Sequence, residues 1–411
     1  MRISTTYFMQ QGVDAITHQQ QKISKLQLQL ASGTRVLTPS DDPAASTRAL
    51  SLDQVFSQQE QYIKNAAFAE SKLSLEEDAI DTTENSLQRV KELAIAAASQ
   101  LNGEDERRAM ATEVRQLFNQ MLSTANYRDP TGEYIFAGFQ SKTKPFNLDI
   151  NGNVVYAGDQ GQRTVNIGNQ VQVAVNDPGD VVFNAIRNGN GTFAVAASNT
   201  NAGTGLIGEG STNGTFISDT YTLQFTQILA TDDITYTITG ASSGVVGSGT
   251  YATAAQISAN DELSGSFSFN GAQVDISGRP ANSDTFTVSP SSHQDIFTTV
   301  ANFISALEME SDDATERAAV QNGINRSMSD LNQSMDHLIT RRTDIGARRN
   351  TIDKQNVINE DFNQEITSIR SRLMDLDYAQ AISEMNQEML GLEAAQRTFV
   401  RMQDLSIFNY I

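Results

Sequence analysis

The three histidines are the side chains of this chain best suited to acid–base chemistry or to metal binding. They are His18, His293 and His337. A metal centre or a proton relay needs several such groups close together. Each histidine lies on a predicted helix or at its start, far from the others, and none has a second ligand at metal spacing. We therefore predict that no histidine holds a metal and that each is solvated or lies in an interface.

Two other patterns have the form of ligand sites. The stretch Gly203–Gly208 has the G-x-G-x-x-G spacing of a nucleotide-binding loop, which needs a strand before it and a helix after it. The residues that follow, Glu209–Gly214, cannot open a helix, so we predict a surface loop. The pair Asp232–Asp233 offers carboxylates for a hard cation, but a solvated turn is the simpler interpretation. The sequence therefore predicts no catalytic residue, no cofactor and no metal, and hence no enzyme.

The charge of the chain limits its partners. It has 29 Lys and Arg against 49 Asp and Glu, a formal net charge of −20. This argues against nucleic acid and anionic membranes, whose binders present clusters of Lys and Arg. The cluster Arg341, Arg342, Arg348 and Arg349 is predicted to pair with carboxylates of a neighbouring helix. The chain has no Cys, which excludes disulfides and thiolate sites, and no apolar run of about 18 residues that would span a bilayer.

Long apolar stripes with alternating three- and four-residue spacing mark both ends of the chain. Such narrow stripes need another helix beside them, so we predict that the two ends pair with each other and with further copies. Gln59, Glu76 and Thr83 interrupt the first stripe, and a phase slip divides the second after Leu376. The stripes comprise Leu52, Val55, Tyr62, Ala66, Ala69, Leu73, Ile80, Leu87, Val90, Ala94, Ala97 and Leu101, then Phe362, Ile366, Ile369, Leu373 and Leu376. The predicted assembly seam comprises Ile16, Ile23, Leu30, Tyr378, Ile382, Met385, Met389, Leu392 and Phe399.

Capping residues predict where the helices begin. Asp41–Pro43 suits the start of a helix that runs to Leu101, and Glu104 opens the next. Ser292, with Asp295 three residues on, is predicted to cap a later helix, and Ser311–Asp313 to start another.

The middle of the chain has a β composition. Residues 133–175 are predicted to form hairpins, with "GEYIFAGFQ" (Gly132–Gln140) as one alternating segment and Asn151–Gly152 as a tight turn. Between 176 and 289 only Arg187 and Arg279 are basic, and β-branched and aromatic residues alternate with Thr, Ser, Gly and Asn. This predicts a compact β domain with most of its aromatic rings in the core.

Two terminal segments carry a family resemblance. "ASGTRVLTPSDDPAAS" (Ala31–Ser46) and "RSRLMDLDYAQAISEM" (Arg370–Met385) resemble the N- and C-terminal signatures of bacterial flagellins and hook–filament junction proteins. The start "MRISTTYF", the segment "GEYIFAGFQSKTKPF" and the end "DLSIFNYI" are more similar to the junction branch than to flagellin. The resemblance covers about residues 1–140 and 290–411 and leaves out the β segment.

The resemblance implies a mainly α fold with a β insert in nested, discontinuous domains. Residues 1–40 with 365–411 would form an inner coiled-coil domain, 41–175 with 290–364 a long-helix and hairpin domain, and 176–289 an outward β domain. It implies a structural role at the junction between hook and filament, outside the cell in the bacterial flagellum. The partners would be the first hook-associated protein, flagellin, further copies in a ring and a cytoplasmic export chaperone. Export through the flagellar type III apparatus would fit Met1–Gln21, where no cleavable signal is visible.

Two alternatives stay open from the sequence. One is a flagellin, a filament subunit of the same fold. The other is a surface adhesin or binding module, in which the β insert would recognise a ligand and the helices would only hold it.

Overall fold

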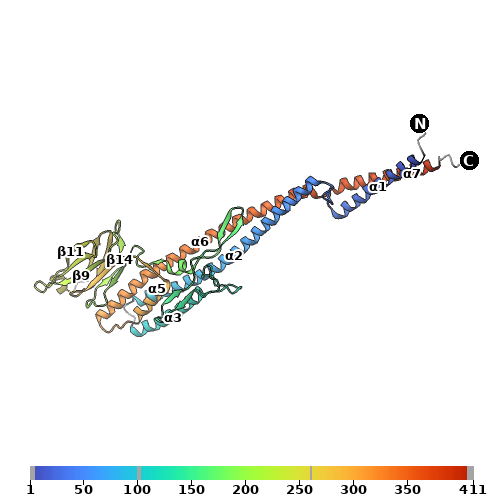
Figure 1. The fold of residues 1–411 in the computed structure, drawn as a ribbon. Coiled ribbons are helices and arrows are strands. Elements are labelled where there is room, and N and C mark those ends of the chain that lie inside the picture. The colour runs from blue at the N-terminus through green and yellow to red at the C-terminus, as the bar shows by residue number, and fades with distance from the viewer. Residues whose placement is uncertain (1–4, 100–102, 260–261, 405–411) are drawn as a thin grey trace. The chain divides into compact units, whose positions relative to one another are not determined.

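The computed structural model describes residues 5–99, 103–259 and 262–404, and Figure 1 shows its fold. Long helices form both ends of the chain, and strands fill its middle, as the sequence predicts. The two longest helices have 55 and 61 residues, whereas helices in globular proteins average about 11–12. Within the described residues the helices are α1 (Thr5–Ser32), α2 (Pro43–Ala97), α3 (Glu104–Ala125), the π-helical η1 (Asp180–Asn184), α4 (Ala254–Ser258), α5 (Ile296–Leu307), α6 (Ala314–Met374) and α7 (Tyr378–Asp404).

Acidic side chains set the starts of the two longest helices where the sequence predicts them. The Ala45 amide donates to Asp42 Oδ1 at 2.9 Å, directly after Pro43 opens α2. At the start of α6, the Glu316 amide donates to Asp313 Oδ1 at 2.8 Å, and the Asp313 amide donates to Glu316 Oε2 at 3.2 Å. This reciprocal pair is a capping box, and it satisfies amides that have no partner inside the helix.

Two predicted helix boundaries differ from the structure. The cap of α5 is Asp295, whose Oδ1 accepts from the Thr298 amide at 2.7 Å. The prediction of Ser292 as the cap is wrong, because the Ser292 amide donates instead to Asn188 Oδ1 at 2.9 Å. Helix α2 ends at Ala97, and the predicted stop at Leu101 lies outside the described residues.

Short hairpins and a larger β domain follow α3. The predicted turn at Asn151–Gly152 joins β1 and β2, and Gly152 has a φ of 83° there. The prediction of an alternating strand at Gly132–Gln140 is wrong: turns occupy most of it, and only Tyr134 makes a bridge, to Arg128. The described strands are β1 (Phe146–Leu148), β2 (Val154–Tyr156), β3 (Thr164–Gly168), β4 (Val171–Ala174), β5 (Ile186–Arg187), β6 (Phe193–Ala197), β7 (Leu206–Ile207), β8 (Ser211–Thr212), β9 (Tyr221–Gln227), β10 (Ile234–Gly240), β11 (Gly244–Ala252), β12 (Ser264–Phe269), β13 (Ala272–Ser277), β14 (Thr285–Pro290) and β15 (His293–Gln294).

The β domain is built from two sheets that share one core. One sheet has the order β11-β10-β9-β14-β6, and the other has the order β12-β13-β7, with β8 also on β13. Rings from both sheets meet: the centroids of Tyr236 and Phe267 are 4.7 Å apart, and those of Tyr221 and Phe269 are 5.1 Å apart. The predicted core role of the aromatic residues is confirmed for the buried rings of Phe193, Tyr221, Phe225, Phe267, Phe269 and Phe286.

The Gly203–Gly208 stretch belongs to this β domain. Leu206 and Ile207 form β7, so the prediction of a surface loop is wrong. The Asn322 side chain of α6 accepts from the Ile207 amide and donates to the Gly205 carbonyl, both at 2.9 Å. A strand rather than a helix comes next, which does not match a nucleotide-binding loop.

The chain divides into two compact units. The first contains residues 1–65, 167–170 and 354–411, and the second contains 66–166 and 171–353. The predicted stripe of α2 is buried in the second unit, where Leu73, Ile80 and Leu87 are fully enclosed. The predicted pairing with a neighbouring helix is confirmed for two of the four arginines: Arg342 bonds Glu84 at 2.8 Å, and Arg349 pairs with Glu70 at 2.7 Å. It is wrong for the other two, because Arg341 pairs with Asp344 of its own helix and Arg348 pairs with Asp177, which is not in a helix.

Candidate functional site

The first unit brings the two ends of the chain together, since α1 and α7 lie side by side (Figure 1). Two glycines permit their close approach. A Cβ added at Gly12 would lie 2.7 Å from the Phe399 ring, and one at Gly391 would lie 2.9 Å from Gln19 Nε2. At Gly12 the Phe399 ring would have to shift to admit a side chain, whereas at Gly391 the flexible end of Gln19 could move aside.

Polar side chains of one turn of α1 contact α7 at Glu388. Gln19 Nε2 donates to the Glu388 carbonyl oxygen at 3.2 Å and also to its carboxylate. Lys22 pairs with that carboxylate at 3.4 Å, although both side chains remain partly exposed. An exposed pair of this kind contributes less than about 1 kcal/mol, so it orients the helices more than it stabilises them.

The nine residues of the predicted assembly seam fall into two groups. Tyr378, Ile382 and Met389 are exposed, with 52%, 46% and 51% of their surface accessible. The others are half-buried in the first unit: Ile16, Ile23, Leu30, Met385, Leu392 and Phe399. The seam is thus only partly covered within one chain.

Apolar side chains on α7 form an open stripe, which we define as Ile382, Met389 and Val400. These residues are seven and then eleven positions apart, and at about 100° per residue both steps return to within about 20° of the same helix face. Val400 is 55% exposed, and the neighbouring Leu390 is 68% exposed. Exposed apolar residues that share one helix face can mark a surface for contact with another chain.

The two signature segments meet where α1 ends and α7 begins. The Arg35 amide donates to the Met374 carbonyl at 2.7 Å, and the Leu376 amide donates to the Gly33 carbonyl at 3.0 Å. The Arg35 guanidinium also reaches the Leu373 carbonyl at 2.8 Å. The phase slip in the sequence corresponds to this interruption between α6 and α7. We call this contact the signature corner.

Carboxylates hold the backbone of the signature corner. Asp41 Oδ2 accepts the amides of Leu37 and Thr38 at 3.1 and 3.0 Å. The hydrogen bond from Lys25, assisted by these amides, lowers the pKa of Asp41 to about 2. Asp377 caps α7 by accepting from the Ala379 amide at 2.9 Å. The carboxylates of both signatures therefore position helices rather than react.

Gly33 controls the geometry of the signature corner. Its φ of +71° is left-handed, and an added Cβ would lie 2.8 Å from Tyr378 Oη. We expect Gly33→Ala to destabilise the first unit by about 1–2 kcal/mol, measured as faster amide exchange in α1 and α7. Gly346→Ala is the control, since that helical glycine has no atom within 4 Å of an added Cβ and should be stabilised by up to about 1 kcal/mol. Unchanged exchange in Gly33→Ala would show that the corner tolerates a side chain.

The three histidines lie on three different elements. His18 is on α1, and His293 is exposed on β15, not at a helix start as predicted. His337 is partly buried on α6, its Nε2 is 2.8 Å from the Val181 carbonyl, and burial lowers its pKa. Across the described part of the chain, no three His, Cys, Asp or Glu side chains gather as a metal site, and no helix is long and apolar enough to cross a membrane.

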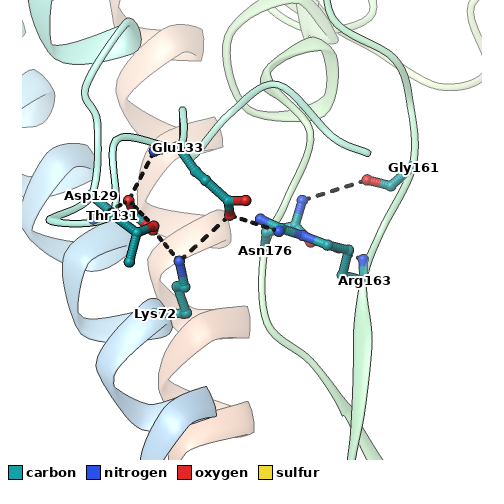
Figure 2. Close-up of polar contacts among 7 residues, drawn as sticks. All are labelled: Lys72, Asp129, Thr131, Glu133, Gly161, Arg163 and Asn176. Atoms are coloured by element: carbon teal, nitrogen blue, oxygen red, sulfur yellow. Dashed lines mark hydrogen bonds and ion pairs between the residues drawn. The ribbon is translucent and has the colours of Figure 1, made fainter. Parts of the chain in front are cut away.

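A polar network in the second unit ties the loop after α3 to α2, as Figure 2 shows. Asp129 Oδ1 accepts the amides of Thr131 and Glu133 at 2.8 and 2.9 Å, which folds the loop around the carboxylate. Lys72 of α2 bonds Asp129 and lies 4.0 Å from Glu133 Oε2. Although burial alone would raise it, the bonds from Lys72 and Thr131 hold the pKa of Asp129 far below its usual range.

The network continues from Glu133 into the hairpin region (Figure 2). Arg163 pairs with Glu133 at 3.2 Å, and the Arg163 amide donates to Asn176 Oδ1 at 2.8 Å. The Asn176 side chain reaches back to the Gly161 carbonyl at 3.5 Å. These contacts join α2, the loop and the hairpins through charged groups that the sequence patterns did not single out.

One helical turn beyond Lys72, Glu76 is fully buried at a position of the apolar stripe. Its Oε1 accepts the Asp177 amide at 3.0 Å, and the Asp177 carboxylate pairs with Arg348 of α6 at 2.9 Å. Burial, together with the nearby Asp177 carboxylate, raises the pKa of Glu76 well above its ordinary value; the Asp177 amide and Arg348 oppose that rise. Polar residues that interrupt a stripe were the sequence signal for this buried cluster.

The pKa of Glu76 predicts a pH dependence of stability. Because folding raises this pKa, Glu76 contributes stability below about pH 4.3, and that contribution is lost as the pH rises toward the folded-state value. Glu76→Gln keeps the acceptor for the Asp177 amide without the charge. We expect its free energy of unfolding to match the wild type near pH 4 and to exceed it by about 1–3 kcal/mol at pH 8. Urea unfolding followed by circular dichroism measures this, and parallel pH profiles would contradict it.

The start of the chain matches a family model. The model describes the bacterial flagellin N-terminal helical region and aligns with residues 3–141. Flagellar hook-associated protein 3 of Salmonella typhimurium is 33% identical over 186 residues, which are 45% of this chain and 58% of that protein. The chain thus aligns with somewhat more than half the length of this curated relative.

Solved structures match over nearly their whole length. The flagellar junction protein FlgL from Legionella pneumophila is 31% identical with a TM-score of 0.71, over 80% of this chain and 99% of that one. Xanthomonas campestris FlgL is also 31% identical, with a TM-score of 0.69, over 78% of this chain and 99% of that one. Its fold, the contact between its two signature segments and these similarities show that the chain belongs to the family of flagellar hook-associated protein 3.

Proposed function

We propose that this protein is a structural subunit of the junction between the flagellar hook and the flagellin filament. Its partners would be the first hook-associated protein, flagellin and further copies of itself in a ring. The open stripe on α7 is the observation that carries this proposal, because apolar residues exposed on one helix face are stabilised when another chain covers them. The family of the chain supports the same role.

We further propose that α1 and α7 act as a coiled coil and that the domains are nested. Residues 1–40 with 365–411 would be the inner domain, 41–175 with 290–364 the middle one, and 176–289 the outer one. The contact between α1 and α7, and the assignment of both chain ends to one compact unit, support this arrangement. Coiled-coil helices whose seams are only half-covered gain stability when further helices join them.

Assembly outside the cell would follow export in an unfolded state, with a cytoplasmic chaperone covering the terminal helices beforehand. The moderately apolar stripe of α2 fits such a route, because Gln59 and the alanines in that stripe leave the helix less stable before it finds partners. No catalytic or cofactor role is part of the proposal.

A filament subunit is the second candidate, since the two kinds of protein share a fold. Growth from seeds separates them: purified flagellin extends short filament fragments, whereas we expect this protein to add a limited layer and stop. Electron microscopy of seeds incubated with the purified chain measures this. Long filaments made of this chain alone would favour the flagellin role and contradict the junction role.

An adhesin remains a weaker alternative. A ligand site of that kind needs aromatic side chains that are free to contact the ligand, but the large rings of the β domain are buried in its core. This arrangement supports a β domain whose rings stabilise the fold.

A further inference from the structure

A cavity of about 360 Å³ in the second unit lies among the end of α2, the start of α3, the start of α6 and the segment that contains β7. Two arginines, Arg107 and Arg317, line it. The apolar part of the wall comes from Ala97, Leu206, Ala318 and Val320.

Arg107 is buried without an opposite charge. Only 5% of its surface is exposed, and it appears in none of the ion pairs formed by the described residues. Its Nη2 donates to the Met309 carbonyl at 3.1 Å and to Ser311 Oγ at 2.9 Å, while the buried Nε has no hydrogen-bond partner in the described structure. Both acceptors are neutral, so the charge of the guanidinium is not balanced.

The acidic residues just before Arg107 form no ion pair with it in the described structure. Glu104 pairs instead with Arg108, which faces solvent on the same helix, and no described ion pair joins Arg107 to Asp105 or Glu106. Arg317 makes only long contacts, to the Ser311 and Asp312 carbonyls at 3.5 and 3.3 Å. Two cations therefore line one cavity without a carboxylate between them.

We propose that this cavity binds a carboxylate group, with Arg107 as the principal ligand and Arg317 at the edge. The guanidinium charge of Arg107 has no carboxylate partner in the described structure, and its Nε–H is a donor without an acceptor there, which a carboxylate oxygen would supply. The alanine, leucine and valine side chains suit the carbon chain that carries the group. The carboxylate belongs either to an acidic side chain of another protein chain or to a free organic acid. With 49 Asp and Glu, every further copy of this chain offers such groups.

Titration of the purified full-length chain with sodium butyrate tests the binding. The readout is the ¹⁵N NMR signal of the Arg107 Nε–H group, identified by its loss in Arg107→Gln. We expect a saturable shift with a dissociation constant on the order of millimolar and a smaller response to inorganic phosphate. A rise in melting temperature with butyrate should accompany it in the wild type and be absent in Arg107→Gln. Arg108→Gln is the matched control, because Arg108 lies next in sequence but is exposed, and it should bind as the wild type does.

A second variant keeps Arg107 and guards against misfolding. Gln321→Glu puts a nearly isosteric carboxylate on the cavity wall, and we expect it to weaken butyrate binding at least about tenfold while the circular dichroism spectrum stays unchanged. No saturable shift up to about 50 mM butyrate, or equal thermal shifts in the wild type and Arg107→Gln, would overturn the proposal. Tighter binding of phosphate than of butyrate would overturn the assignment to carboxylates.

An incorporation experiment in cells decides which source supplies the carboxylate, and this experiment rests on the proposed function. If a neighbouring chain supplies it, both Arg107→Gln and Gln321→Glu should impair incorporation into the junction. Normal incorporation of both, together with butyrate binding in solution, assigns the site to a free acid. Because the titration uses the isolated chain, its failure would leave the junction role unaffected, and failure of the junction role would leave the titration valid.

Discussion

Replacing Met389 with Asp is expected to abolish incorporation of the protein into the flagellum. Met389 is half exposed in the single chain, so the substitution leaves the isolated fold intact. In an assembled ring the open stripe would be covered, and an unpaired carboxylate buried there costs about 3–5 kcal/mol per copy. That corresponds to roughly 10²–10⁴-fold weaker association at each contact. Swimming in soft agar and electron microscopy of isolated hooks measure the loss.

A matched control uses the same helix. Ser383→Asp adds the same charge to α7 at an exposed polar position outside the open stripe and should assemble normally. The β domain of Met389→Asp should unfold at the same urea concentration as that of the wild type, because none of its core residues is touched. If Met389→Asp supports normal filaments, the open stripe is not an assembly surface.

Replacing Arg348 with Met is expected to destabilise the second unit by about 3–5 kcal/mol. Arg348 is the cation of the buried cluster, and its loss leaves the Asp177 carboxylate, which is only 3% exposed, beside Glu76 without an opposite charge. The side-chain Nε2 of Gln162 still donates to Asp177 Oδ1 at 2.6 Å, but a neutral donor does not balance a buried charge. The midpoint of urea unfolding, followed by circular dichroism, measures the change.

Two comparisons isolate the electrostatic part of this effect. Arg341→Met removes an arginine of similar exposure on the same helix, but its partner Asp344 is solvated, so the loss should stay below about 1 kcal/mol. Adding Glu76→Gln to Arg348→Met should recover part of the lost stability, because one of the two carboxylates is then neutral. Equal losses for Arg341→Met and Arg348→Met would show that packing, and not charge, is responsible.

The sequence predicted the helices best, because their signals are local. The caps at Asp42 and Asp313 and the three-four stripe of α2 each follow from residues a few positions apart. The wrong predictions are those that depend on distant partners. Leu206 and Ile207 lie between glycines and have the sequence of a loop, but they form a strand because they pair with β13. Ser292 has a side chain suited to a cap, but Asp295 is the cap, and the Ser292 amide donates to Asn188 Oδ1.

The surface that we propose for assembly was only partly predictable. The period of the apolar residues on α7 placed Ile382 and Met389 in the seam, but the half-buried and the exposed members belong to different faces of one helix. Which members are half-buried and which are exposed depends on where α1 packs against α7. The buried charges were not predicted, although Glu76 and Thr83 stood out as polar residues in an apolar stripe. Their partners, Asp177 and Arg348, lie far along the chain and are brought close only by the fold.

Electron microscopy of the native bacterium with the gene deleted tests the junction role most directly. The junction account predicts cells with complete hooks, no filaments and flagellin released into the medium, and recovery of filaments when the gene is restored. Normal filaments on the deleted cells would contradict it.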